Sequence, residues 1–281
     1  MKRKNKKLSR TKKIEFGGIP MKKIIHSKHS LINNISNKSL KFYLILTLSL
    51  SGLVACSGQV RTEEASNYNA ELGIRYLQKN RLKLANEKLM KAIEQNPESV
   101  KSNHYFALLQ VKLGNNTKAS KYFSKAIKLD PKDSELRNNY GSFLCERNKP
   151  NAAIKQFSVA IKDPLYETPE FAYTNAGICL RKVNNHVQAE RYFRQALKKK
   201  HSFPKALLEM ARLYNDRRIY PKAQAFMFRY EKVGKSSPEA LQLCAVINKK
   251  MQDNSKANRC KTTLLRLFPE SKEAIQISKL F

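Results

Sequence analysis

The side chains best suited to chemistry in this 281-residue chain are five cysteines, which can form disulfides, bind metal ions or carry a covalent modification. Four of them lie in the second half of the chain, at Cys145, Cys179, Cys244 and Cys260. Four cysteines allow three pairings. We expect Cys145 with Cys179, and less firmly Cys244 with Cys260, because each pair falls on neighbouring helices of the array derived below. Buried free thiols are the alternative for each pair.

The remaining polar residues form no pattern typical of an enzyme. The histidines make no HExxH motif and no Cys/His ribbon spacing, and the sequence has no phosphate-binding glycine loop. Of only five aspartates, Asp130, Asp133 and Asp163 fall at turns between repeats, where they serve as caps. We therefore expect no catalytic residue, no metal ion and no cofactor.

The sequence around Cys56 differs from that around the other four cysteines. Residues 1 to 41 hold 13 basic residues and one acid, and residues 42 to 55 then run without charge. These 14 apolar or small residues are too few for the roughly 20 that span a bilayer, so they are typical of an export signal. The segment ends in Leu53-Val54-Ala55-Cys56, which resembles the bacterial lipobox, whose cysteine is lipidated and becomes the first mature residue. We expect a signal peptide at 1–55 and a lipidated tether at 56–65.

Two neighbouring residues refine this prediction. Met21 opens a second n-region, so residues 1–20 are either a long leader or a misassigned start. Ser57 follows the cysteine where an inner-membrane lipoprotein would carry Asp, and the resemblance to lipoproteins then implies sorting to the outer membrane. The acyl chains, at about 0.8 kcal/mol per buried CH₂, would hold the protein there, facing the periplasm.

The elements that position the other cysteines follow from a ladder of six alanines. The rungs are 34 residues apart, except for one gap of 36, and stand at Ala85, Ala119, Ala153, Ala189, Ala223 and Ala257. Four residues after each rung stands a bulky apolar side chain in five cases, with Lys261 as the exception, and twelve before it stands Gly or Ala. These spacings place small and large residues on facing sides of two antiparallel helices, and 34 residues is the length of a tetratricopeptide (TPR) repeat.

The fold class predicted is therefore an all-α TPR solenoid of six helix-turn-helix repeats forming a right-handed superhelix. Pro97, Pro131 and Pro269 are expected to stop second helices. The predicted segments are 66–99, 100–133, 134–169, 170–203, 204–237 and 238–271, followed by a C-terminal capping helix at 272–281.

Such an array offers a groove lined by its first helices. In the first two repeats we expect an apolar strip with polar neighbours that takes an extended or helical peptide. Leu77 and Leu108 can instead pack between repeats. The candidate lining residues are Asn67, Ala70, Glu71, Ile74, Leu77, Lys101, His104, Tyr105 and Leu108.

The charge of the chain is strongly positive. Of 55 basic and 22 acidic residues, 13 and one precede Cys56, which leaves 42 and 21 in the mature protein. The lysines are spread through every repeat without a zinc-finger, RNP or helix-turn-helix pattern, and an exported protein rarely meets nucleic acid. We favour a basic solvated surface with attraction to anionic lipid or cell-wall polymer.

Repeats three and four contain three sequence segments that are more distinctive than the general TPR pattern. Asn138-Asn-Tyr-Gly-Ser-Phe-Leu-Cys145, Asp163-Pro-Leu-Tyr166 and Asn175-Ala-Gly-Ile-Cys179 resemble the PilF/PilW family of type IV pilus biogenesis lipoproteins. The resemblance runs from Tyr68 to about Ala274 and includes the two-residue insertion. It implies a pilotin, an outer-membrane lipoprotein that helps the pilus secretin localise, insert and multimerise, or that stabilises the fibre. It also implies that Cys145 and Cys179 are the family's paired cysteines.

The sequence thus favours a non-enzymatic assembly factor whose partner is the secretin subunit of a type IV pilus or related machine. A TPR adaptor for cell-wall hydrolases or envelope proteases is the alternative. An accessory for DNA uptake is a third hypothesis.

Overall fold

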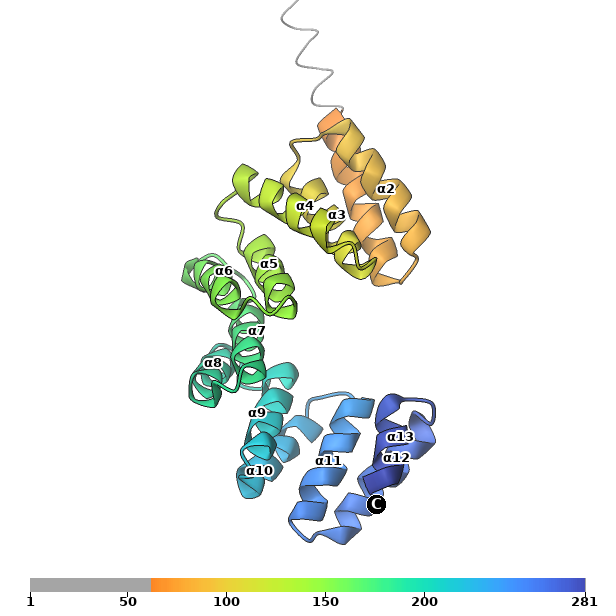
Figure 1. Cartoon of the computed structure of the whole chain (residues 1–281), viewed down its shortest axis with the longest axis vertical. Coiled ribbons are helices and arrows are strands. Elements are labelled where there is room, and N and C mark those ends of the chain that lie inside the picture. Colours follow the sequence, from red (N-terminus) through yellow and green to blue (C-terminus); the bar gives the residue numbers. More distant parts are fainter. Residues whose placement is uncertain (1–61, 281) are drawn as a thin grey trace, which may run out of the picture. The chain divides into compact units, whose positions relative to one another are not determined.

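The computed structural model describes residues 62–280, so the expected signal peptide, Cys56 and the start of the tether lie outside the described range. All regular secondary structure within this range is α-helical, and the prediction of an all-α array of TPR helix pairs is confirmed (Figure 1). A helix over residues 62–78 comes first. It is followed by α2 (Leu82–Gln95), α3 (Val100–Lys112), α4 (Asn116–Leu129), α5 (Ser134–Glu146), α6 (Pro150–Lys162), α7 (Pro169–Lys182), α8 (His186–Lys199), α9 (Pro204–Asp216), α10 (Tyr220–Glu231), α11 (Pro238–Lys250), α12 (Asn254–Leu267) and α13 (Lys272–Leu280).

Each hairpin closes where a small residue of the first helix faces a large one of the second. All six ladder alanines are at most 1% exposed, and the rings of Phe123, Phe157 and Phe193 are fully buried. A Cβ added at Gly141 would lie 2.7 Å from the Phe157 ring, and one added at Gly177 would lie 2.5 Å from the Phe193 ring. The glycines are therefore required by the close approach of the two helices.

The turn inside each hairpin contains one residue with positive φ. These residues keep the stride of the alanine ladder, five positions before each rung: Asn80, Gly114, Asn148, Asn184, Arg218 and Gln252. A left-handed residue after a helix reverses the chain and frees it to enter the next helix. Glycine and asparagine, which adopt this conformation at low cost, hold four of the six places.

The first helices begin at caps or prolines. Ser99, Asp133 and Ser237 each accept a hydrogen bond from the backbone N–H three residues later. Pro204 and Pro238 are the first residues of α9 and α11, where no backbone donor is needed. The second helices α2, α4 and α12 end two residues before Pro97, Pro131 and Pro269.

The first helix of each repeat packs against both helices of the repeat before it, as α5 does against α3 and α4, α7 against α5 and α6, and α9 against α7 and α8. At the end of the array α13 packs on α11 and α12, where Ala274 and Ile277 are buried against Ala245 and Leu264. Within the described residues, no helix combines the length and apolar character that crossing a membrane requires.

Candidate partner-binding pocket

A pocket of about 590 Å³ lies on the first helices of the first two repeats. The helix at 62–78 and α3 form its walls, and α5 contributes one residue. Its lining comprises Glu71, Ile74, Arg75, Leu77, Gln78, Tyr105, Leu108, Val111, Lys112 and Glu135.

Helical periodicity accounts for the apolar floor of this pocket. Ile74 and Leu77 are three residues apart on one helix, as are Leu108 and Val111 on α3, so each pair shares a helix face. All four side chains are half-buried, which leaves apolar surface open to a ligand. Such a floor can hold the apolar side chains of an extended or helical peptide.

Charged side chains surround the floor. Glu71 and Glu135 provide carboxylates, and Arg75 and Lys112 provide exposed cations. Lys101 pairs with Glu71, with 2.9 Å between Nζ and Oε1. A peptide with both charged and apolar side chains matches this lining better than a purely apolar one.

Tyr105 adds a neutral hydrogen-bonding group. Burial, helped by the nearby carboxylates of Glu71 and Glu135, raises the pKa of Tyr105 to about 12. Burial also raises the pKa of Glu135, and the carboxylate of Asp133 adds to the effect. The phenol therefore keeps its proton at neutral pH and can donate to a carbonyl of a bound peptide.

The structure separates the nine residues proposed from the sequence. Five line the pocket: Glu71, Ile74, Leu77, Tyr105 and Leu108. Lys101 reaches the pocket only through its ion pair with Glu71, and Asn67 is half-buried outside the lining. Ala70 is fully buried and His104 is 3% exposed, so both are part of the packed interior.

His104 lies beneath the pocket in an apolar setting. Its ring is 6.1 Å from that of Phe123, and its Nε2 is 3.0 Å from Nδ2 of Asn139. Burial lowers the pKa of His104 to about 4, although the carboxylate of Asp133 opposes the shift. The neutral imidazole accepts the Asn139 amide hydrogen and joins α3 to α5.

Five lining residues were missed by sequence reasoning: Arg75, Gln78, Val111, Lys112 and Glu135. Four of them lie three or four positions after a residue that was proposed, so extending the helical period by one turn would have found them. Glu135 belongs to the third repeat. It enters the pocket because α5 packs beside α3.

Two disulfides join neighbouring helices. Cys145 of α5 is bonded to Cys179 of α7 with 5.7 Å between their Cα atoms, and Cys244 of α11 is bonded to Cys260 of α12 with 6.0 Å. The first bond connects two successive repeats, and the second closes a single hairpin. By the chain-entropy model, bridges of these lengths stabilise a fold by about 3 to 4 kcal/mol each.

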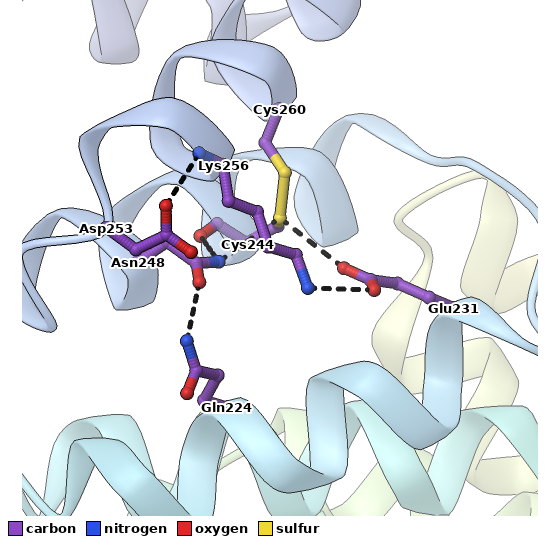
Figure 2. Close-up of a disulfide and its surroundings, with 7 residues drawn as sticks. All are labelled: Gln224, Glu231, Cys244, Asn248, Asp253, Lys256 and Cys260. Carbon is purple, nitrogen blue, oxygen red and sulfur yellow. Dashed lines mark hydrogen bonds and ion pairs between the residues drawn. A yellow bond between two sulfur atoms is a disulfide. The ribbon is translucent and has the colours of Figure 1, made fainter.

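Figure 2 shows the surroundings of the second disulfide. Glu231 lies with Oε1 3.6 Å from Sγ of Cys244, and its other oxygen accepts a hydrogen bond from Lys256 Nζ at 3.0 Å. Asn248 donates to the carbonyl of Cys244 at 2.8 Å and accepts from Gln224 at 2.8 Å. Glu231, Cys244 and Cys260 place their ligand atoms within 4.8 Å of one another. With the sulfurs bonded to each other and Lys256 on the carboxylate, this group does not offer a metal site.

Comparison with known proteins identifies both the type of repeat and the family of similar proteins. Tetratricopeptide repeat models match residues 101–133 and 122–155. The type IV pilus assembly protein PilF of Pseudomonas aeruginosa is 28% identical over 235 residues, which cover 82% of this chain and 93% of PilF. The crystal structure of PilW, a widely conserved type IV pilus biogenesis factor, is similar with a TM-score of 0.69 and 29% identity, covering 75% of this chain and 97% of PilW. The structure of P. aeruginosa PilF is similar with a TM-score of 0.67 and 27% identity, covering 78% of this chain and 99% of PilF.

Proposed function

Because the chain belongs to the PilF/PilW family of type IV pilus assembly TPR proteins, we propose that it is a non-enzymatic assembly factor for a type IV pilus. Its role is to bind a subunit of the pilus secretin and to assist its localisation and multimerisation at the outer membrane. We expect the six repeats to form the right-handed superhelix of a TPR array.

The observation that carries this proposal is the pocket at the first two repeats. Ile74, Leu77, Leu108 and Val111 leave apolar surface open at its floor, and side chains of both charges surround it. Apolar surface flanked by polar groups that fix orientation is typical of a peptide-binding site. Leu77 and Leu108 pack against the cores of the repeats, yet both are only half-buried, which leaves part of each side chain open to a ligand.

The proposal places a lipid on Cys56. The described helices begin at residue 62, so only a few residues would separate the lipidated cysteine from the first helix. The pocket would then be presented close to the outer-membrane surface, where a secretin subunit inserts. Changing Cys56 to Ala is expected to shift the protein from the outer-membrane fraction to the inner membrane or the periplasm, and unchanged fractionation would exclude the lipid anchor.

Secretin multimers provide the direct test of function. Cells that lack the protein are expected to lose most of the multimeric secretin on non-denaturing gels and to recover it with the wild-type chain. Leu77→Gln with Leu108→Gln should fail to restore the multimers, because two polar side chains replace the apolar floor. Val187→Gln on α8 is the matched control, since Val187 is 62% exposed and lies outside the pocket.

Two outcomes would contradict the proposal. One is a wild-type level of secretin multimers in cells without the protein. The other is co-purification of the wild-type chain with cell-wall hydrolases or envelope proteases and without secretin, which would favour the adaptor alternative. Equal amounts of each variant on immunoblots and equal helical content by circular dichroism separate binding from folding.

A further inference from the structure

A second pocket, with a different chemistry, lies farther along the same row of first helices. It has a volume of about 430 Å³ and is formed by α5, α7 and α9. The residues that determine its character are Asn138, Asn139, Glu146, Asn175, Lys182 and Lys205. It shares no residue with the apolar pocket of the first two repeats.

Within this pocket, side-chain oxygens of the asparagines accept hydrogen bonds, while several side-chain N–H groups remain free to donate. Asn175 Nδ2 donates to Asn138 Oδ1 at 2.9 Å, and Lys205 Nζ donates to Asn175 Oδ1 at 2.8 Å. The side-chain oxygen of each of these two asparagines therefore already accepts one hydrogen bond. Within residues 62–280, Asn138 Nδ2 donates no hydrogen bond, and Lys205 retains two further N–H groups. The pocket thus offers an excess of donors to a ligand.

The charge of the pocket agrees with this excess. Lys182 and Lys205 approach from α7 and α9, and neither forms an ion pair with any residue of the described part of the chain. Glu146 is the single acid in the lining. Burial lowers the pKa of Lys205, and the carboxylate of Glu209 on the same helix only partly offsets this shift. By contrast, Arg181 on α7 pairs with both Glu209 and Asp216.

The first disulfide fixes the geometry of this pocket. Cys145 belongs to the lining, and its bond to Cys179 holds α5 against α7, the two helices that carry the asparagines. Asn139 is held from the other side by its contact with His104 Nε2. Donors on three helices are therefore ordered before a ligand arrives, which reduces the entropy lost on binding.

We propose that this pocket binds the side-chain carboxylate of an Asp or Glu within an extended peptide, between Lys182 and Lys205. A side chain fits better than a terminal carboxylate, because pockets continue along the first helices on both sides, at Leu108 on α3 and at Gln242 on α11. The asparagine amides pair with the backbone of the same peptide. The inference rests on the proposed function only for the identity of the partner.

The test uses the full chain purified in detergent and two sets of immobilised peptides with blocked ends. One set tiles the secretin of the same cell, with a copy in which every Asp and Glu is replaced by Asn or Gln. The other set has randomised sequences of the same composition. We expect acidic peptides to bind about tenfold more weakly to the Lys182→Gln/Lys205→Gln variant, which loses charge-assisted hydrogen bonds, and neutral copies to bind both proteins equally weakly. Lys198→Gln, an exposed lysine on α8, is the matched control and should bind as wild type.

Each outcome separates this inference from the proposed function. Secretin peptides that bind as well without their acids would overturn the carboxylate pocket and leave the secretin partner standing. Lysine-dependent binding of randomised acidic peptides without any secretin peptide would sustain the pocket and remove the secretin. Binding restricted to copies of these peptides made with a free C-terminus, or equal binding of the acidic peptides to the wild-type chain and to the Lys182→Gln/Lys205→Gln variant, would overturn the inference.

Discussion

His104 and Tyr105 are consecutive residues on one helix, yet their side chains lie in different surroundings. Both lie on α3, yet His104 is buried under the pocket while Tyr105 lines it. The imidazole is neutral because burial lowers its pKa to about 4, and in this form it accepts the amide hydrogen of Asn139. Of these two neighbouring polar aromatic residues, one therefore lies in the interior and the other lines the pocket.

Acidification tests the buried histidine. The pKa of His104 is lowered from 6.5 to about 4 in the folded protein, so the unfolded chain takes up the proton first as the pH falls. The contribution of this group to stability is present above pH 6.5 and is lost between about pH 6.5 and 4. Over that window the loss is up to about 3 kcal/mol.

The variant His104→Gln cannot titrate and should show a flatter dependence of the free energy of unfolding on pH. Urea denaturation at pH 7, 5.5 and 4.5 measures it, with His201→Gln as the control at an exposed position. A wild-type pH slope in His104→Gln would show that another group causes the acid sensitivity.

Gly177 tests the closest helix contact. A methyl group there would lie 2.5 Å from the buried Phe193 ring, and well-packed interiors tolerate such overpacking poorly. We expect Gly177→Ala to lower the free energy of unfolding by about 1 to 3 kcal/mol. Adding Phe193→Leu should recover part of that loss, because the smaller side chain leaves room. Stability equal to wild type in Gly177→Ala, measured by thermal unfolding, would contradict the close approach.

At the scale of the element, the same turn conformation recurs in every helical hairpin. Six residues with positive φ stand at the same place in the six hairpins. Four of them are glycine or asparagine, but Arg218 and Gln252 adopt the same conformation at a steric cost.

This difference predicts which turns can be improved. We expect Arg218→Asn to raise the free energy of unfolding by up to about 1 kcal/mol, because asparagine tolerates the left-handed region better than arginine does. The reverse change, Asn184→Arg at the equivalent turn of the fourth repeat, should lower it by a similar amount. Calorimetry of the two variants measures both effects, and shifts of the same sign would be incompatible with this explanation.

The helix pairs could be predicted from sequence because the alanine ladder repeats a purely local pattern. Small and large residues at spacings of 3, 4 and 7 specify which helix faces meet. Packing between nearest neighbours then stacks the repeats. The place of each proline relative to the helices was harder to predict from the sequence. Proline both follows second helices, as at Pro97, and opens first helices, as at Pro204, since its missing donor is harmless at either place.

At the scale of the whole molecule, the row of first helices carries two pockets of different chemistry. The apolar pocket lies at the first two repeats, and the donor-rich pocket lies on α5, α7 and α9. Periodicity identified residues of the first pocket on the helix at 62–78 and on α3. It could not identify Glu135, Lys182 or Lys205, because their surroundings depend on contacts between repeats.

The net charge of the mature chain acquires a more specific meaning at this scale. Most lysines within residues 62–280 are exposed on the surface, where they raise solubility and attraction to anions without marking a site. Lys182 and Lys205 differ because they line a pocket in which the side-chain oxygens of Asn138 and Asn175 already accept hydrogen bonds. Pairing and hydrogen bonding therefore distinguish these two lysines better than the count of charges does.

Site-specific photocrosslinking in living cells tests the central claim most directly. A photoreactive residue placed at Tyr105, in the apolar pocket, is expected to form an adduct that contains the pilus secretin. The same residue at the exposed Val187 of α8 should not form it. Adducts with secretin from Tyr105 alone are the predicted result. Equal adducts from both positions, or adducts from Tyr105 that contain a cell-wall hydrolase and no secretin, would contradict the account.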